Sequence, residues 1–263
     1  MSKPLTIEFS GKCIIVTGGN RGIGLGFSRA LAKAGARVAI IYKSNKDAPK
    51  VAEDLEKEFS VKVRAYKCDV TNAKQTVEMF ESIDKELGPV TGLIANAGVS
   101  VVKPALELTT EDFKYVYNVN VLGVFNSAVA AAKLWKGKKL ENLSIVITSS
   151  ISSQIINQAA TNEPLTQVFY NSSKAAVSNL TMGLAAEWAN HNIRVNSVAP
   201  GYVKTDQTDN LPDEVIQYEK DHIPMRKFAT PDQIAGQALF LLSEYASYMT
   251  GGEHRVDGGQ LIW

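Results

Sequence analysis

The stretch CIIVTGGNRGIG (residues 13–24) predicts the fold of the chain. Its first five residues are apolar or β-branched, which indicates a buried strand, and the glycines that follow permit a tight turn into a helix. In such a turn the backbone can approach a pyrophosphate, which the helix N-terminus then binds. Gly18, Gly22 and Gly24 are spaced G-x-x-x-G-x-G rather than the commoner G-x-G-x-x-G. We expect a dinucleotide-binding turn, the alternative being an ordinary turn with incidental glycines.

Short apolar runs and longer segments of helical period alternate along the rest of the chain. Strands are predicted at 13–17, 37–42, 61–70, 92–98, 143–150, 193–201 and 254–259. Helices are predicted at 21–35, 47–59, 72–87, 111–135, 170–189 and 231–244. Strands that alternate with helices pair in parallel through right-handed crossovers. We therefore predict one α/β domain over residues 1–263, a doubly wound parallel sheet of six or seven strands with helices on both faces.

The composition is that of an ordinary soluble protein. Of 263 residues, 45% are apolar and 21% charged, and the net charge of +1 gives no electrostatic reason to expect nucleic acid or an anionic membrane as a partner. No apolar run approaches the roughly 18 residues of a membrane span, and the first residues lack the apolar stretch of a secretory signal, so we expect a cytoplasmic protein. Cys13 and Cys68 are expected to be buried free thiols. The three histidines show no metal-ligand spacing, and no metal site is predicted.

The end of the second predicted strand, IIYKSN (40–45), bears on the choice of dinucleotide. NAD enzymes of this kind usually carry an acidic residue there, and this chain has none. Lys43 and Arg21 could form charge-assisted hydrogen bonds with a 2′-phosphate, so we predict NADP(H). The alternative is that both are solvated surface residues. Asp69, at the end of the third strand, could accept from the adenine amino group or act as a turn aspartate.

Several motifs occur together and in order: TGGNRGIG (17–24), ANAG (95–98), NVN (118–120), SS (149–150), YNSSK (170–174) and PGYVKT (200–205). As a set they resemble the short-chain dehydrogenase/reductase family over essentially the whole chain. The resemblance implies a Rossmann-type fold with strand order 3-2-1-4-5-6-7 and usually a homotetramer or homodimer. Within the family, the chain looks like the fungal NADP-dependent mannitol 2-dehydrogenases and sorbose reductases.

The resemblance implies that Asn120, Ser150, Tyr170 and Lys174 are the catalytic residues. Tyr170 and Lys174 are four residues apart and share one helix face. An ammonium about 4 Å from a phenol, at an effective dielectric of about 20, would lower the phenol pKa from about 10 to near 7, where it serves as a general acid and base. Ser150 would bind the substrate oxygen, with Ser149 as the competitor for this role. Asn120 would kink its helix and hold a water that relays protons from Lys174.

The predicted cofactor-binding residues follow the strand ends. They are Gly18, Asn20, Arg21, Gly22, Ile23, Gly24, Lys43, Ser44, Asp69, Val70, Asn96, Ala97, Gly98, Tyr170, Lys174, Pro200, Gly201, Val203 and Thr205. Val203 and Thr205 would hold the nicotinamide carboxamide. The chain departs from the family pattern NNAG at Ala95, and we expect no loss of activity from this change.

Two segments are predicted to surround the substrate. The nineteen residues 151–169 are more than many family members have between the catalytic serine and tyrosine, and they carry several amides and hydroxyls. Ser152, Gln154, Asn157 and Gln158 are the predicted substrate contacts, and Asn162 and Gln167 lie in the same segment. The polar segment 202–224 is predicted to be a lid.

The predicted reaction is the NADPH-dependent reduction of a ketose, D-fructose, to D-mannitol. This reaction is reversible. The alternatives are an L-sorbose or xylulose reductase, a broad carbonyl or 3-oxoacyl reductase, and a non-catalytic NADPH-binding sensor. The chain ends in GGQLIW, and the apolar tail, including Trp263, is predicted to pack at a subunit interface.

Overall fold

The computed structural model describes residues 6–158, 163–206, 208–209 and 211–262. Within them, seven parallel strands form one sheet in the order β3-β2-β1-β4-β5-β6-β7. The strands are β1 (Cys13–Thr17), β2 (Arg37–Tyr42), β3 (Val63–Lys67), β4 (Val90–Ala95), β5 (Leu143–Thr148), β6 (Ile193–Pro200) and β7 (Glu253–Val256). The predicted parallel sheet and its strand order are confirmed.

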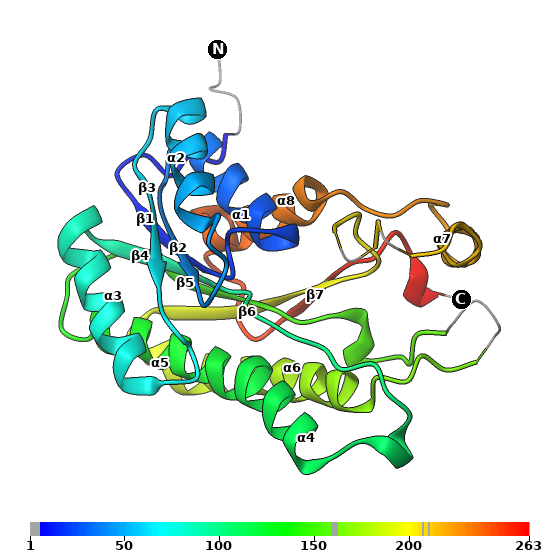
Figure 1. Cartoon of the computed structure of the whole chain (residues 1–263). Coiled ribbons are helices and arrows are strands. Elements are labelled where there is room, and N and C mark those ends of the chain that lie inside the picture. The colour runs from blue at the N-terminus through cyan, green and yellow to red at the C-terminus, as the bar shows by residue number, and fades with distance from the viewer. Residues whose placement is uncertain (1–5, 159–162, 207, 210, 263) are drawn as a thin grey trace.

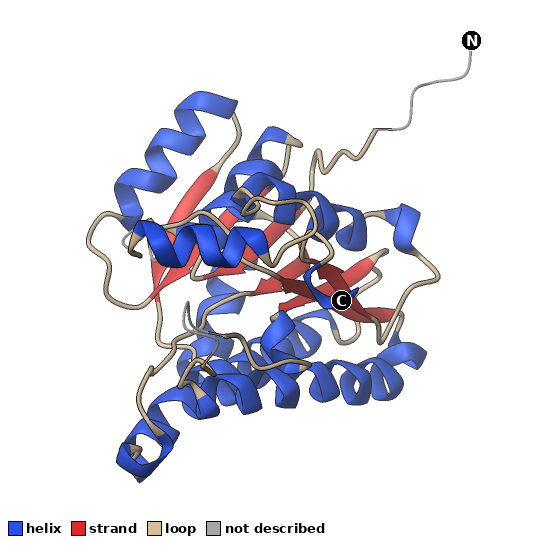
Figure 2. Ribbon diagram, turned by 90° about the vertical axis from the view of Figure 1, so that its right-hand side faces the viewer, coloured by secondary structure: helices blue, strands red, loops and turns tan. Residues whose placement is uncertain are grey.

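Helices cover both faces of this sheet (Figures 1 and 2). The α-helices are α1 (Gly22–Lys33), α2 (Ala48–Phe59), α3 (Ala73–Leu87), α4 (Thr110–Tyr117), α5 (Val124–Trp135), α6 (Val168–Trp188), α7 (Asp213–Asp221) and α8 (Pro231–Leu242). Helices α1, α2 and α8 pack on one face, around Phe27, Leu55 and Ile234, and α3, α5 and α6 pack on the other, around Phe80 and Val177. The central strands are buried on both faces, as their continuous apolar runs predict.

The register of the sheet aligns the carboxyl ends of its central strands. Thr17 pairs with Ile41, and Ala95 at the end of β4 pairs with Ile147 of β5. The turns that follow β1, β4 and β5 therefore open at one edge of the sheet. The strand order reverses between β1 and β4, which is where ligands bind in open α/β sheets.

The helix predicted at 111–135 is divided into three parts. A π-helical segment, η2 (Asn118–Gly123), separates α4 from α5. The side chain of Asn120 in this segment accepts a hydrogen bond from Val99 N–H at 2.8 Å and donates to Val99 O at 2.9 Å. The helix widens where this side chain binds the loop after β4, which agrees with the predicted irregularity at Asn120.

Two further boundaries differ from the prediction. Strand β4 ends at Ala95 rather than at 98, because the next two N–H groups, of Asn96 and Ala97, donate to the Thr17 hydroxyl at 2.9 and 3.0 Å. Part of the predicted polar loop at 202–224 is helix α7. This helix begins with two acidic residues and has Lys220 in its last turn, an arrangement that its dipole favours.

Both cysteines are buried free thiols, as predicted. Across the described ranges, we find no helix with the length and apolar character that a membrane span requires.

Candidate active site

A cavity of about 740 Å³ opens at the carboxyl ends of the strands. All the predicted cofactor-binding residues line it, and so do three predicted catalytic and substrate residues, Ser150, Ser152 and Asn157. Three predicted site residues do not line it: Asn120, Gln154 and Gln158. The tertiary structure thus brings together residues that lie almost two hundred positions apart in sequence.

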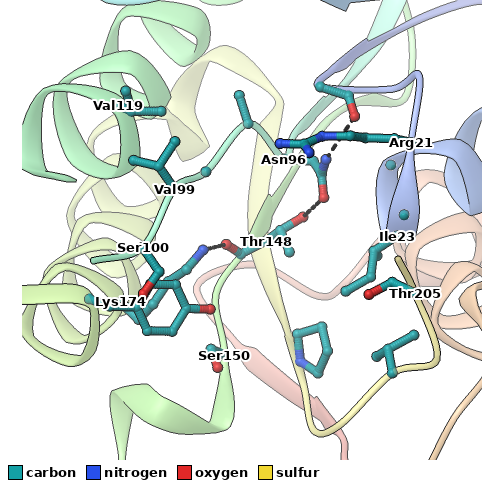
Figure 3. A pocket seen from close by; sticks show the side chains of 18 of the residues that line it. Arg21, Ile23, Asn96, Val99, Ser100, Val119, Thr148, Ser150, Lys174 and Thr205 are labelled. Atoms are coloured by element: carbon teal, nitrogen blue, oxygen red, sulfur yellow. Dashed lines mark hydrogen bonds between the residues drawn. The ribbon is translucent and has the colours of Figure 1, made fainter. Parts of the chain in front are cut away.

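The view into the cavity shows two sides (Figure 3). Ser150 and Lys174, from the end of β5 and from α6, lie on one side. Arg21 and Ile23, from the turn into α1, lie across from them together with Thr205. The cavity therefore joins a hydroxyl-bearing end to a glycine-rich end.

The glycine-rich end is too tightly packed for other side chains. Gly18 has φ +66°, and a Cβ on Gly24 would lie 2.1 Å from the Gly18 carbonyl oxygen. Asn20 is 7% exposed, and its buried Nδ2 has no hydrogen-bond partner within the described ranges. The turn thus offers an unused donor beside the start of α1, which suits a ligand rich in oxygen acceptors such as a pyrophosphate.

A hydrogen-bond network holds the strand ends together between the two sides. The Asn96 amide donates to Thr17 O at 3.1 Å and accepts from Thr148 Oγ1 at 3.2 Å, so it connects β1, β4 and β5. Lys174 Nζ donates to Thr148 O at 2.7 Å (Figure 3). Asn96 lines the cavity, but its side chain is bound to protein groups.

The cations predicted at the nucleotide end differ in their surroundings. Arg21 is exposed, and its side chain has no hydrogen bond or ion pair with any residue that the structure describes. Lys43 Nζ lies 2.7 Å from the Asp69 carboxylate. Burial raises the pKa of Asp69, but the hydrogen bonds from Lys43 and Thr71 outweigh this effect and lower it. The two residues predicted to contact separate parts of the cofactor are thus an ion pair.

Tyr170 and Lys174 lie together on α6, as predicted. Lys174 is 5% exposed, and its Nζ lies 5.6 Å from the centre of the Tyr170 ring. Burial lowers the pKa of Lys174 to about 8, so its ammonium still predominates at neutral pH. The part of Tyr170 that remains accessible opens into the cavity.

The predicted lowering of the Tyr170 pKa to near 7 is wrong for this structure. Burial raises the pKa of the phenol, and a hydrogen bond with Ser150 opposes this rise. The physical reason is that a phenolate loses hydration in this site, while the Lys174 ammonium is directed to the Thr148 carbonyl.

The structure distinguishes the two neighbouring serines. Ser149 Oγ lies 2.8 Å from Ser178 Oγ on α6 and 3.4 Å from Lys174 O. Ser150 caps a short 3₁₀ helix, η3 (Ile151–Ser153), by accepting from Ser152 N–H, and its hydroxyl is near enough to the Tyr170 phenol to lower the phenol pKa. Ser150 therefore lies nearer to the predicted reacting groups than Ser149 does.

Asn120 lies behind the cavity wall rather than on it. Besides its two bonds with Val99, its Nδ2 donates to Ser173 Oγ at 3.0 Å. A Cβ on Gly98 would lie 3.5 Å from Asn120 Oδ1 and 3.8 Å from Lys174 Nζ, so these groups are neighbours. Asn120 connects η2, the loop after β4 and α6. Its predicted role in a proton relay stays a prediction.

Some predicted substrate residues of segment 151–169 line the cavity, whereas others bond with neighbouring segments. Asn157 Nδ2 donates to Ser152 Oγ at 2.9 Å, and both residues line the cavity. Gln154 Nε2 donates to Glu253 Oε1 at 2.5 Å, and Gln158 Oε1 accepts from Tyr218 on α7 at 3.2 Å. Asn162 lies outside the described residues.

Several residues that line the cavity were not predicted from the sequence. They are Ile41, Tyr42, Asn45, Cys68, Val99, Ser100, Tyr115, Val119, Thr148, Ile151, Leu165, Tyr202, Asp206 and Thr208. Most of them adjoin a predicted motif, so their closeness in sequence to the strand ends could have identified them as cavity residues. Tyr115 and Val119 lie in a helix and gave no such signal, because only the packing of α4 and η2 brings them to the cavity.

The chain is similar over nearly its full length to several characterised groups of proteins. A family model described as enoyl-(acyl carrier protein) reductase matches residues 18–260. A probable NADP-dependent mannitol dehydrogenase of Yarrowia lipolytica is 36% identical over 98% of this chain and 91% of the relative. Sorbose reductase of Schizosaccharomyces pombe is 36% identical over 97% and 98%.

Two further similarities extend this range. The 3-oxoacyl-[acyl-carrier-protein] reductase MabA of Mycobacterium tuberculosis is 35% identical over 95% of this chain and 93% of the relative. The crystal structure of a short-chain type dehydrogenase/reductase from Mycobacterium marinum superposes with a TM-score of 0.88, at 36% identity, with 98% of each chain covered.

Proposed function

Because the chain belongs to the short-chain dehydrogenase/reductase family, we propose that it is an NADP(H)-dependent oxidoreductase that reduces a ketose, with D-fructose to D-mannitol as the leading reaction. One observation carries the proposal. Ser150, Tyr170 and Lys174 meet at one end of a cavity whose other end is the glycine-rich turn. The names of the mannitol dehydrogenase and sorbose reductase relatives support a sugar ketone as substrate.

The residues of the glycine-rich end fit NADP(H). The turn leaves no room for a Cβ at Gly24, and Asn20 carries a buried donor without a partner among the described residues. Arg21 and Lys43 would hold the 2′-phosphate, with Lys43 shared between that phosphate and Asp69. Val203 and Thr205 would hold the nicotinamide end. When bound, NADPH supplies the hydride.

The residues of the other end handle the proton. Tyr170 is the acid that protonates the ketone oxygen, and its raised pKa keeps the phenol protonated at neutral pH, as reduction requires. Ser150 donates to the same oxygen as negative charge develops there. Lys174 lies beside the Tyr170 ring with its Nζ bonded to Thr148 O, and it completes this end of the cavity.

Segment 202–224 is proposed as a lid over the substrate. It contributes Tyr202, Asp206 and Thr208 to the lining, and Tyr218 on its helix bonds with Gln158 of the opposite rim. Opening would separate these two segments and admit substrate. Location in the cytoplasm and assembly into a homotetramer stay predictions.

The second candidate is a 3-oxoacyl reductase, which the similarity to MabA favours. The deciding experiment follows NADPH oxidation by the purified chain with D-fructose, L-sorbose, D-xylulose and an acetoacetyl thioester side by side. We expect the highest kcat/KM with a ketose. A clear preference for the thioester would support the second candidate.

The cofactor is tested in the same assay with NADH in place of NADPH. We expect a higher kcat/KM with NADPH, because Arg21 and Lys43 have no phosphate to bind in NADH. Equal values with the two cofactors would contradict the assignment of these residues to the 2′-phosphate.

A further inference from the structure

Gln167 is a buried polar residue at the substrate end of the cavity. It is 6% exposed and lines the cavity. It occupies the N-cap position of α6, but its side chain makes no capping hydrogen bond. The amide makes no hydrogen bond with any other residue that the structure describes. Neither its oxygen nor its nitrogen is fully buried. The amide is therefore accessible from the cavity and unused by the protein.

The backbone around Gln167 is held by three hydrogen bonds. Gln167 N–H donates to Leu165 O at 2.9 Å, and Gln167 O accepts from Asn171 N–H at 3.0 Å. The preceding residue, Thr166, accepts from Lys103 N–H at 2.7 Å. Binding of a ligand to the amide therefore requires no rearrangement of the backbone at Gln167.

Gln167 also has a defined place relative to the reacting groups. It is the N-cap residue of α6, three residues before Tyr170, and both residues line the cavity. The neighbouring polar wall is neutral as well: Ser152 is 3% exposed and accepts from Asn157 Nδ2. An uncharged amide that can both donate and accept suits a hydroxyl group rather than a phosphate or carboxylate.

From this position we infer that Gln167 is a specificity-determining residue that binds a hydroxyl on the carbon next to the reacting carbonyl, so that the enzyme selects α-hydroxy ketones. The inference rests on the proposed function, because it takes the carbonyl to bind at Ser150 and Tyr170. A ketone without that hydroxyl would leave the Gln167 amide desolvated and unpaired, which disfavours its binding.

The test compares two ketones that differ only in this hydroxyl, 1-hydroxy-2-butanone and 2-butanone. The full chain and Gln167→Met are assayed with NADPH, and kcat/KM is measured for each ketone. We expect Gln167→Met to lower the value for the hydroxyketone by about tenfold or more and to leave the value for 2-butanone unchanged or slightly higher. The quantity compared between proteins is the ratio of kcat/KM for the hydroxyketone to kcat/KM for 2-butanone. This comparison cancels the difference in intrinsic reactivity between the two ketones.

Gln237→Met is the matched control, since Gln237 lies on α8, outside the proposed lid, and does not line the cavity. Its hydroxyketone-to-ketone ratio should equal that of the unmodified chain. If Gln167→Met does not fold, Gln167→Leu also removes both the donor and the acceptor with a side chain of similar size, and its ratio should fall as well.

The outcomes separate the inference from the proposed function. A ratio that stays the same in Gln167→Met, whether both values fall together or neither changes, overturns the role of Gln167. Absence of NADPH oxidation with every ketone in the unmodified, folded chain overturns the proposed function instead.

Discussion

Tyr170 presents a phenol hydroxyl to the end of the cavity that Ser150 and Lys174 share. Replacing it with phenylalanine removes the proton donor and leaves the ring that packs beside Lys174. We expect Tyr170→Phe to lower kcat for ketose reduction by about 10²–10⁴-fold, the usual contribution of a general acid. NADPH affinity, measured by fluorescence titration, should be retained, because the variant removes one hydroxyl and leaves the other predicted cofactor-binding residues in the cavity unchanged.

Tyr248→Phe is the control for this variant, since Tyr248 is fully exposed and should tolerate the change. Turnover near normal in Tyr170→Phe would show that another group supplies the proton.

The pKa of Tyr170 gives a second prediction at the residue scale. Oxidation of the alcohol needs the phenolate, and burial raises the phenol pKa, so the rate of oxidation should rise with pH through the alkaline range. The hydrogen bond from Ser150 lowers this pKa. Ser150→Ala should therefore move the rise of kcat to still higher pH, besides lowering the maximum rate.

The pH profile of polyol oxidation with NADP⁺ checks this. The same apparent pKa in both proteins would mean that the Ser150 hydroxyl does not bond with the phenol during catalysis.

At the scale of elements, helix α7 is attached to the rest of the molecule by a buried carboxyl. Glu219 is 3% exposed and lies beside Tyr202, which lines the cavity. Burial raises the pKa of Glu219 above its ordinary value of 4.5, against opposing effects of Tyr202 and His222. Above pH 4.5 the folded state therefore holds a proton that the unfolded state has released.

The free energy of unfolding should consequently fall as pH rises from 4.5 to the raised pKa of Glu219, and stay reduced above it. Glu219→Gln removes this loss. We expect the variant to gain stability relative to the unmodified chain between pH 4.5 and pH 8, with about 1.4 kcal/mol for each pH unit by which the two pKa values differ. Thermal unfolding of both proteins across this range tests it. If the free energies of unfolding of the two proteins changed with pH in parallel, protonation of Glu219 would not be linked to stability.

The bounds of the strands and helices show which features could be predicted from sequence patterns. The five residues of β1 and the glycines after them predicted a strand, a turn and a helix start that the structure confirms. The division of the helix at 118–123 depends on a hydrogen bond between Asn120 and Val99, which are 21 residues apart. Hydrophobic period carries no information on such a bond, so only an irregularity at Asn120 was predicted.

At the scale of the whole molecule, the predicted homotetramer has support from exposed apolar side chains. Phe125 on α5 and Val168 and Met182 on α6 are 41%, 50% and 52% exposed. Helices α5 and α6 cover the same face of the sheet (Figure 1). Apolar groups of this size on neighbouring helices are typical of an interface. The predicted contact of Trp263 lies outside the described residues.

Light scattering should give a mass near four times the 28.5 kDa of one chain. Met182→Glu places a charge in the predicted interface and should yield smaller species. Lys50→Glu should not, because Lys50 is exposed on α2, outside the predicted interface. A mass of one chain for the unmodified protein would refute the assembly.

The sequence by itself determined the order of strands and helices, the glycine-rich turn and the helical pairing of Tyr170 with Lys174. These are local properties, set by side-chain period and by residues within a few positions of one another. The tertiary structure alone decided that Ser149 turns to Ser178, that Lys43 pairs with Asp69, and that Gln167 rather than Gln154 or Gln158 opens into the cavity. It also reversed the expected direction of the Tyr170 pKa. The physical reason is that burial and hydrogen-bond partners come from segments distant in sequence, and they become defined only when the strand ends meet.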